Sequence, residues 1–201
     1  YLEAATLDPE TAQYVTAAVE TMIGEGRFAD AESVLSQYGG RFTDSAAVHH
    51  LRGRIAMMNS KWSEAVDSLQ RASLIDDEDP WLLADLARAQ FAAGHHTDCL
   101  TTTSQLKGAF NDADLDREID RLHARCLVDA HRFREAHRSL STFTQTYSDD
   151  IEAWIDFALV CREVGDRHQL RKAATRVVSL DRSRFEGYFL LGCSFFDCFN
   201  D

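Results

Sequence analysis

The chain has 201 residues, of which 45% are hydrophobic and 27% are charged, a composition typical of a folded globular protein. Its formal charge is −12, from 33 acidic and 21 basic residues. This acidic excess disfavours a broad phosphate-binding surface, so we expect no nucleic-acid partner. The chain contains no apolar run of the roughly 18 residues that a spanning helix needs, so we expect no membrane insertion.

The cysteines are odd in number, and their spacing fits neither a zinc site nor a disulfide framework. Most fall on predicted buried helix faces, where a free thiol behaves as a small hydrophobic group. This usage favours a reducing compartment, and we expect a cytoplasmic location. Because the first residue is Tyr1 rather than Met, we expect the chain to be an excerpt of a longer protein. The cysteines are Cys99, Cys126, Cys161, Cys193 and Cys198.

Helical periodicity runs through the chain, and the alternation typical of strands is weak. Leu82, Leu83 and Leu86 belong to one wide apolar stripe, and Leu127, Phe133, Ala136, Leu140 and Phe143 continue the same spacing later. The sequence therefore predicts an all-α fold. Capping residues mark the expected helix starts, namely Asp8 before Pro9, Thr43 to Ser45, Asp79 before Pro80, and Asp149 or Asp150.

A short motif recurs along the chain at nearly constant spacing. Its five copies begin 34, 34, 37 and 34 residues apart, so a single three-residue insertion brings all of them into register. At the first position one helix must end and the chain must reverse, which requires a conformation that glycine tolerates. The copies are Gly26–Ala31, Ser60–Ala65, Gly94–Cys99, His131–Ala136 and Gly165–Leu170.

Small residues recur at two further positions of this motif. Five residues after the turn stand Ala31, Ala65, Cys99 and Ala136. Seven residues before it stand Val19, Gly53, Ala87, Ala124, Ala158 and later Gly192. A small residue on each of two facing helices allows the close packing of an antiparallel helical hairpin. Two residues after the turn come apolar side chains that can fill the space beneath it, Phe28, Trp62 and Phe133.

This period and these positions resemble the tetratricopeptide repeat, a helix-turn-helix unit of about 34 residues. The resemblance covers about residues 12–198 and implies one domain over 1–201, a right-handed superhelical solenoid of antiparallel helix-turn-helix repeats. Three residues depart from the pattern: Arg52 replaces a large apolar residue, His131 replaces the turn glycine, and Leu170 replaces a small residue. The expected repeats are 12–45, 46–79, 80–113, 117–150, 151–184 and a partial 185–201.

The resemblance also implies that the first helix of each hairpin lines a concave groove that receives extended peptides. By register, Arg54, Arg88 and Arg125 share one position in three consecutive repeats, and Arg121 lies one helical turn before Arg125. Guanidinium groups can bind carboxylates bidentately, and neighbouring aromatic side chains can hold an apolar group. We therefore expect an acidic peptide ligand, with a groove formed by His50, Arg54, Trp81, Arg88, Phe91, Arg121 and Arg125.

An alternative is that neighbouring acids such as Glu20, Asp85 and Glu118 pair with these arginines and leave a solvated face without a ligand. Some members of the family bind chaperone C-termini through a clamp of lysine, asparagine and arginine. This sequence has Thr16, Glu20 and Leu51 where that clamp requires lysine and asparagine, so we expect no binding of that class.

The C-terminal segment Phe185–Phe196 is apolar where a solenoid normally carries a polar capping helix. We therefore expect either that the native chain continues beyond Asp201 or that this end is buried in a dimer. The expected function is a protein interaction scaffold that binds an extended acidic peptide of a partner. Two alternatives stay open: a substrate-recruiting arm of a larger enzyme, and a self-assembly module that uses Phe195, Phe196 and Phe199.

Several short sequence features suggest chemical sites but lack the further residues that such sites need. The pairs His49-His50 and His95-His96 point in different directions on a helix and lack further ligands at suitable spacing, so no metal site is expected. Cys161 and His168 could form a nucleophile pair, but no orienting group or oxyanion loop accompanies them. No glycine-rich phosphate loop occurs. We expect no catalysis and no cofactor.

Overall fold

The computed structural model describes residues 12–110 and 112–196. In these ranges the chain forms helices and turns without strands, which confirms the predicted all-α fold class. The chain divides into two compact units, Tyr1–Ala109 and Phe110–Asp201. The expectation of one domain over residues 1–201 stays a prediction. The Asp8–Pro9 capping signal, Cys198 and Phe199 lie outside the described residues.

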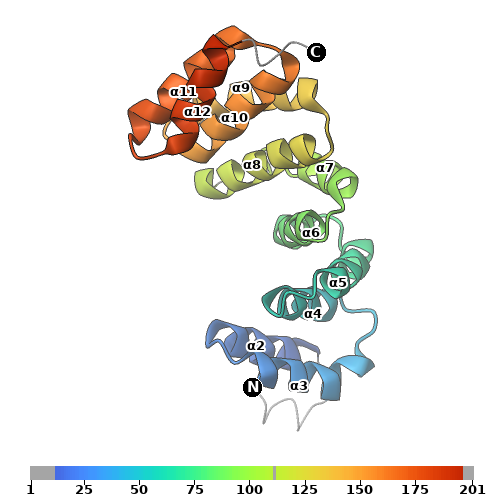
Figure 1. The fold of residues 1–201 in the computed structure, drawn as a ribbon. Helices are drawn as coiled ribbons and strands as arrows, with labels where there is room; N and C mark the ends of the chain where they lie inside the picture. The colour runs from blue at the N-terminus through green and yellow to red at the C-terminus, as the bar shows by residue number, and fades with distance from the viewer. Residues whose placement is uncertain (1–11, 111, 197–201) are drawn as a thin grey trace. The chain divides into compact units, whose positions relative to one another are not determined.

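In residues 12–109, the described part of the first unit, the chain forms three helical hairpins (Figure 1). The first helices of the hairpins, α2, α4 and α6, contact one another in order, and each packs against its own second helix. A short 3-10 turn, η1 (Gly39–Arg41), follows the first hairpin. The helices are α2 (Ala12–Gly24), α3 (Phe28–Tyr38), α4 (Ala46–Met58), α5 (Trp62–Ile75), α6 (Pro80–Ala92) and α7 (His96–Gln105).

The described part of the second unit, residues 110 and 112–196, forms two hairpins and one further helix, α12. Helix α12 packs against α11 and α10, in the position of a first helix, and within the described residues no second helix follows it. The helices are α8 (Ala113–Asp129), α9 (Phe133–Thr146), α10 (Ile151–Val164), α11 (Arg167–Leu180) and α12 (Phe185–Phe195).

Every predicted turn position adopts the left-handed backbone conformation. The φ angles are 74° at Gly26, 57° at Ser60, 80° at Gly94, 56° at His131 and 76° at Gly165. The hydrogen bonds that end each first helix explain this conformation. At the second turn, for example, the backbone N–H of Ser60 donates to Met57 and that of Lys61 donates to Ala56. The left-handed residue brings both N–H groups back toward carbonyls that have no other partner in the helix.

Side-chain caps begin the first helices where the sequence places them. The hydroxyl of Ser45 accepts a hydrogen bond from Val48 N, and the carboxylates of Asp79 and Asp150 accept from Trp81 N and Ala153 N. Because each cap binds a backbone N–H that the helix itself leaves unpaired, it defines where the helix starts. Two caps were not predicted from the sequence, Asp112 before α8 and Asp166 before α11.

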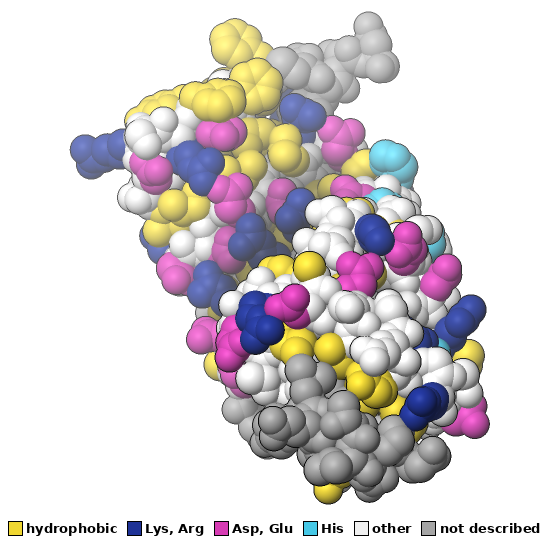
Figure 2. All heavy atoms as spheres, turned by 90° about the horizontal axis from the view of Figure 1, so that it is seen from below, with side chains coloured by type: hydrophobic (Ala, Val, Ile, Leu, Met, Phe, Trp, Pro, Cys, Tyr) yellow, Lys and Arg dark blue, Asp and Glu magenta, His cyan; other side chains and the backbone are white. Residues whose placement is uncertain are grey.

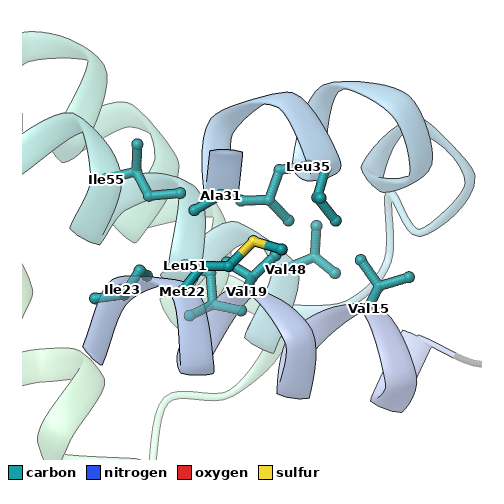
Figure 3. Packing of buried hydrophobic residues seen from close by; sticks show 10 residues of the cluster. Val15, Val19, Met22, Ile23, Ala31, Leu35, Val48, Leu51 and Ile55 are labelled. Atoms are coloured by element: carbon teal, nitrogen blue, oxygen red, sulfur yellow. The ribbon is translucent and has the colours of Figure 1, made fainter. Parts of the chain in front are cut away.

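The core of the first unit lies between the two helices of each hairpin and the first helix of the next. Figure 3 shows Val19, Met22, Leu35 and Leu51 from α2, α3 and α4 pointing toward one another. In the first unit the small positions of the motif are buried, including Ala31 and Ala65 with 0% exposure, and this lets the paired helices approach closely.

Buried thiols contribute to both units. Cys99, Cys126, Cys161 and Cys193 are buried, as expected for cysteines that act as small hydrophobic groups. Among the helices that the structure describes, none is long and apolar enough to cross a bilayer.

Candidate functional site

A pocket in the first unit brings together four of the predicted groove residues. His50 and Arg54 of α4 and Trp81 and Arg88 of α6 line it, because α4 and α6 are neighbouring first helices. Asp85 of α6 completes the polar part of the lining. We name this site the α4–α6 pocket. Its volume is about 400 Å³.

Asp85 lies at the centre of the basic side chains of the pocket. Its carboxylate accepts a hydrogen bond from Arg88 Nη1 at 2.7 Å and one from His50 Nε2 at 2.9 Å. Arg54 Nε lies 3.9 Å from the same carboxylate. Burial raises the pKa of Asp85, but the hydrogen bond and charge of His50, together with Arg88, outweigh it and lower the pKa below its ordinary value. Asp85 is therefore ionised at neutral pH.

This arrangement confirms part of the alternative interpretation, because Asp85 does pair with the predicted basic residues. One carboxylate nevertheless faces two guanidinium groups and an imidazole in the pocket. The side chains of Arg54 and Arg88 remain 36% and 29% exposed, so both can reach a ligand in the pocket. The local charge is positive, in contrast to the chain as a whole.

Apolar side chains form the other part of the α4–α6 pocket. Trp81 is 57% exposed and Met58 is 54% exposed, and Met57 lies beside them in the lining. Asp79 caps the first turn of α6 and thereby fixes the backbone at Trp81. Sequence reasoning did not assign the two methionines to the site. Their spacing was the available signal, because Met57 and Met58 stand three and four residues after Arg54 on α4 and so share its helix face.

Phe91 does not line this pocket. It lies near the end of α6, and its ring meets the ring of His96 in α7 edge to face, with centroids 5.8 Å apart. Phe91 is therefore not among the residues that line the α4–α6 pocket, and its role in ligand binding stays a prediction.

Arg121 and Arg125 lie on α8 in the second unit, among more acidic neighbours. Arg121 Nη1 lies 3.5 Å from Asp150, which Arg117 also contacts at 3.2 Å. Arg121 and Arg125 both lower the pKa of Asp156 on α10, although burial has the larger effect and raises it overall. These two arginines thus act within an ion network of the second unit.

Two basic residues and one acidic residue occupy matching repeat positions in the two units. His50, Arg54 and Asp85 stand 71 residues before Arg121, Arg125 and Asp156, which is two repeats along the chain.

Different residues surround the matching positions in the second unit. The residues 71 positions after Met58, Trp81 and Arg88 are Asp129, Glu152 and Leu159. The second unit therefore lacks, at these positions, the third basic group and the apolar wall of the α4–α6 pocket. Figure 2 shows charged side chains of both signs next to one another on the viewed face.

Cys161 and His49, two residues of the motifs considered above, are both buried. Burial, with a smaller contribution from the charge of Asp166, raises the pKa of the Cys161 thiol to about 12, so it is not a thiolate at neutral pH. His49 is buried and its Nε2 lies 2.8 Å from the carbonyl oxygen of Thr43, a structural contact. Within residues 12–110 and 112–196, no group of three or more metal-ligating side chains comes together.

The comparison with protein families agrees with the repeat pattern. The family model described as tetratricopeptide repeat matches residues 56–126, which include α5, α6, α7 and most of α8. No characterised protein sequence matches the chain.

Solved structures of repeat proteins share the fold at low sequence identity. YrrB, described as a TPR protein with an unusual peptide-binding site, superimposes with a TM-score of 0.84 at 12% identity, over 94% of this chain and 95% of that chain. MamA from Desulfovibrio magneticus RS-1 gives a TM-score of 0.65 at 15% identity, over 74% and 82% of the two chains. Cut9, in the APC/C hetero-tetramer Cut9–Hcn1, gives 0.65 at 14% identity over 96% of this chain and 38% of that chain.

Proposed function

Because this chain folds as tetratricopeptide repeats, we propose that it is a protein interaction scaffold whose α4–α6 pocket binds an acidic, extended peptide segment of a partner. The tetratricopeptide-repeat family model and the fold shared with YrrB both support an interaction scaffold. The peptide and its acidic character are our proposal. One observation carries it: two arginines and a histidine surround a single carboxylate beside an exposed tryptophan.

The ligand that fits this pocket has an acidic side chain next to a bulky apolar one. A ligand carboxylate would interact with Arg54 and Arg88, because guanidinium groups bind carboxylates with strong charge-assisted hydrogen bonds. The apolar side chain would pack on Trp81, Met57 and Met58, and methionine adapts to irregular shapes. YrrB, which has the same fold, is a protein with a peptide-binding site, and this supports a peptide as the ligand class.

Fluorescence anisotropy with labelled peptides tests this proposal. A peptide that contains Asp-Leu and Glu-Phe pairs should bind, and the matched peptide with Asn and Gln in place of the acids should bind about tenfold more weakly. Affinity should fall with added salt, because the contacts are between partly exposed charges.

The double variant Arg54→Gln/Arg88→Gln should lose about tenfold in affinity. The variant Arg71→Gln, which removes an exposed arginine of α5 away from the pocket, is the matched control and should bind normally. Equal affinity of the double variant and the wild type would refute the acidic-peptide proposal. Binding of a basic peptide in preference to the acidic one would refute it as well.

A second candidate function, self-association through α12, has its own observation in the second unit. Phe185, Tyr188 and Phe189 of α12 are exposed, and at Gly192 on the same helix a Cβ would meet no atom within 4 Å. At the matching position Gly53, Leu69 of the second helix fills this space. We propose that α12 of a second copy packs here, since the exposed residues of α12 are apolar and thus complement themselves.

Light scattering over a concentration series tests this second candidate. Wild-type protein should form dimers, and Tyr188→Ser/Phe189→Ser should remain monomeric. Leu74→Ser, at an 87% exposed position of α5 in the first unit, is the matched control and should still dimerise. A wild-type protein that stays monomeric at millimolar concentration would exclude dimerisation through α12.

A further inference from the structure

A second pocket of the first unit lies between α3, α4 and α5, apart from the residues of the α4–α6 pocket. Its volume is about 240 Å³. Leu35, Ile55 and Ala56 form its apolar part, and all three are buried in the fold. Arg52 and Lys61 are the two basic residues in its lining. We name it the α3–α5 pocket.

The α3–α5 pocket lies where Arg52 replaces the large apolar residue of the repeat pattern. In two later first helices, α6 and α10, the same position holds Leu86 and Phe157, and both are buried in the core. Arg52 extends instead toward the end of α3, where its Nη2 lies 2.8 Å from the place that a Cβ on Gly39 would occupy. Glycine at position 39 thus makes room for the guanidinium group, and an aliphatic side chain no longer fills the space beside Leu35 and Ile55.

The positive charge of Arg52 has no counter-ion in the part of the chain that the structure describes. The side chain is partly buried and makes no hydrogen bond or ion pair there. Lys61, by contrast, lies 3.8 Å from Glu32 and 3.6 Å from Glu64. Lys61 therefore offsets part of the charge of the two acids in the lining, and Arg52 is the basic group left to meet a ligand.

A partly desolvated guanidinium group that lacks a carboxylate costs free energy, which an anionic ligand would recover. The guanidinium fork matches the geometry of a carboxylate. Glu32 and Glu64 in the same lining would repel a doubly charged phosphate more strongly than a single carboxylate. The apolar part and the small volume require a short aliphatic group beside the anion.

We propose that the α3–α5 pocket binds a carboxylate attached to a short branched aliphatic group, with Arg52 binding the carboxylate and Leu35, Ile55 and Ala56 contacting the aliphatic group. Two sources share this chemistry: the C-terminal residue of a polypeptide that ends in leucine, valine or isoleucine, and a free short-chain carboxylic acid. This site is separate from the acidic-peptide pocket, so the two proposals can succeed or fail independently.

Methyl NMR titrations test the proposal on the wild-type chain without any substitution. N-acetyl-leucine should give saturable shifts of the Leu35 and Ile55 methyl signals, and N-acetyl-leucine amide should bind about tenfold more weakly because it lacks the charge. A hexapeptide with a free C-terminal leucine and isovalerate distinguish the two sources. Whichever of these two probes binds more tightly identifies the source of the ligand, and saturable binding of either one supports the shared chemistry.

Two substitutions of Arg52 complete the test. Arg52→Gln removes the charge and should weaken N-acetyl-leucine about tenfold, whereas Arg52→Leu restores the residue type found at Leu86 and should abolish binding by filling the pocket. Arg134→Gln, at an exposed position of α9 outside the lining of this pocket, is the matched control and should bind N-acetyl-leucine normally. Equal binding of the acid and the amide, unchanged binding by Arg52→Gln, or no saturable shift with any probe would each overturn the proposal.

Discussion

Gly53 of α4 lies so close to Leu69 of α5 that a Cβ at position 53 would be 2.4 Å from Leu69 Cγ. No other glycine in the described part of the chain brings two helices this close together. The contact explains why the small position of the motif holds the smallest residue in this hairpin, where the facing residue is a fully buried leucine.

Gly53→Ala should destabilise the protein, because the new methyl group overlaps Leu69 and the core cannot move away without strain. Overpacking of this kind costs about 1–3 kcal/mol, which exceeds the gain of about 1 kcal/mol from replacing glycine by alanine in a helix. Gly192→Ala, at the same position of the motif but in open space, is the control and should stabilise α12. Urea denaturation of both variants measures the two effects, and a stabilised Gly53→Ala would contradict the contact.

Ser60→Gly should stabilise the second turn. Ser60 has a φ of 57°, and a side chain in this left-handed region costs about 1 kcal/mol relative to glycine. Thermal unfolding should show a higher midpoint for Ser60→Gly, and the reverse change Gly26→Ser at φ 74° should lower it. A lower midpoint for Ser60→Gly would indicate that its side chain makes a contribution in the turn that outweighs the backbone cost.

Asp85→Asn should increase the affinity of the α4–α6 pocket for acidic peptides. The substitution removes the carboxylate that now competes for His50, Arg54 and Arg88. A gain of about fivefold is expected for removing one partly buried repulsive charge. Asp67→Asn, on an exposed position of α5, changes the net charge equally and should leave affinity almost unchanged. Weaker peptide binding by Asp85→Asn, with its fold intact by circular dichroism, would count against the proposed ligand.

Asp156→Asn should stabilise the protein at neutral pH. Burial raises the pKa of Asp156, and Glu152 and Asp129 raise it further, although Arg125 and Arg121 oppose them. A carboxyl group whose folded pKa lies above its unfolded value favours folding while it is protonated, and this contribution is lost as the pH rises through the folded pKa. The stability difference between Asp156→Asn and the wild type should therefore grow with pH from about 4 upward. Denaturation curves at several pH values measure it, and a difference that shrinks over this interval would reverse the assigned direction.

Much of the fold could be predicted from the sequence because its signals are local. The turn positions Gly26, Gly94 and Gly165 need only the backbone freedom of glycine, and Asp79 and Asp150 cap helices through bonds to residues two or three positions away. Ser60 and His131 adopt the same conformation without being glycine, because the hydrogen bonds that end α4 and α8 require it.

The candidate site was predicted only in part. His50, Arg54, Trp81 and Arg88 do line one pocket, since register along stacked helices determines which residues face each other. The register did not indicate that Phe91 contacts His96 instead.

The sequence by itself determined the repeat period, the helical hairpins and the residues that share a face, because these follow from hydrogen bonds and hydrophobic spacing within a short stretch of chain. Only the tertiary structure decided that Asp85 also contacts His50 and Arg54 of the neighbouring first helix, and that Arg52 extends toward Gly39 beside an open pocket. These contacts depend on the rotamers and distances of side chains that packing brings together from different repeats, so no spacing rule within one repeat predicts them.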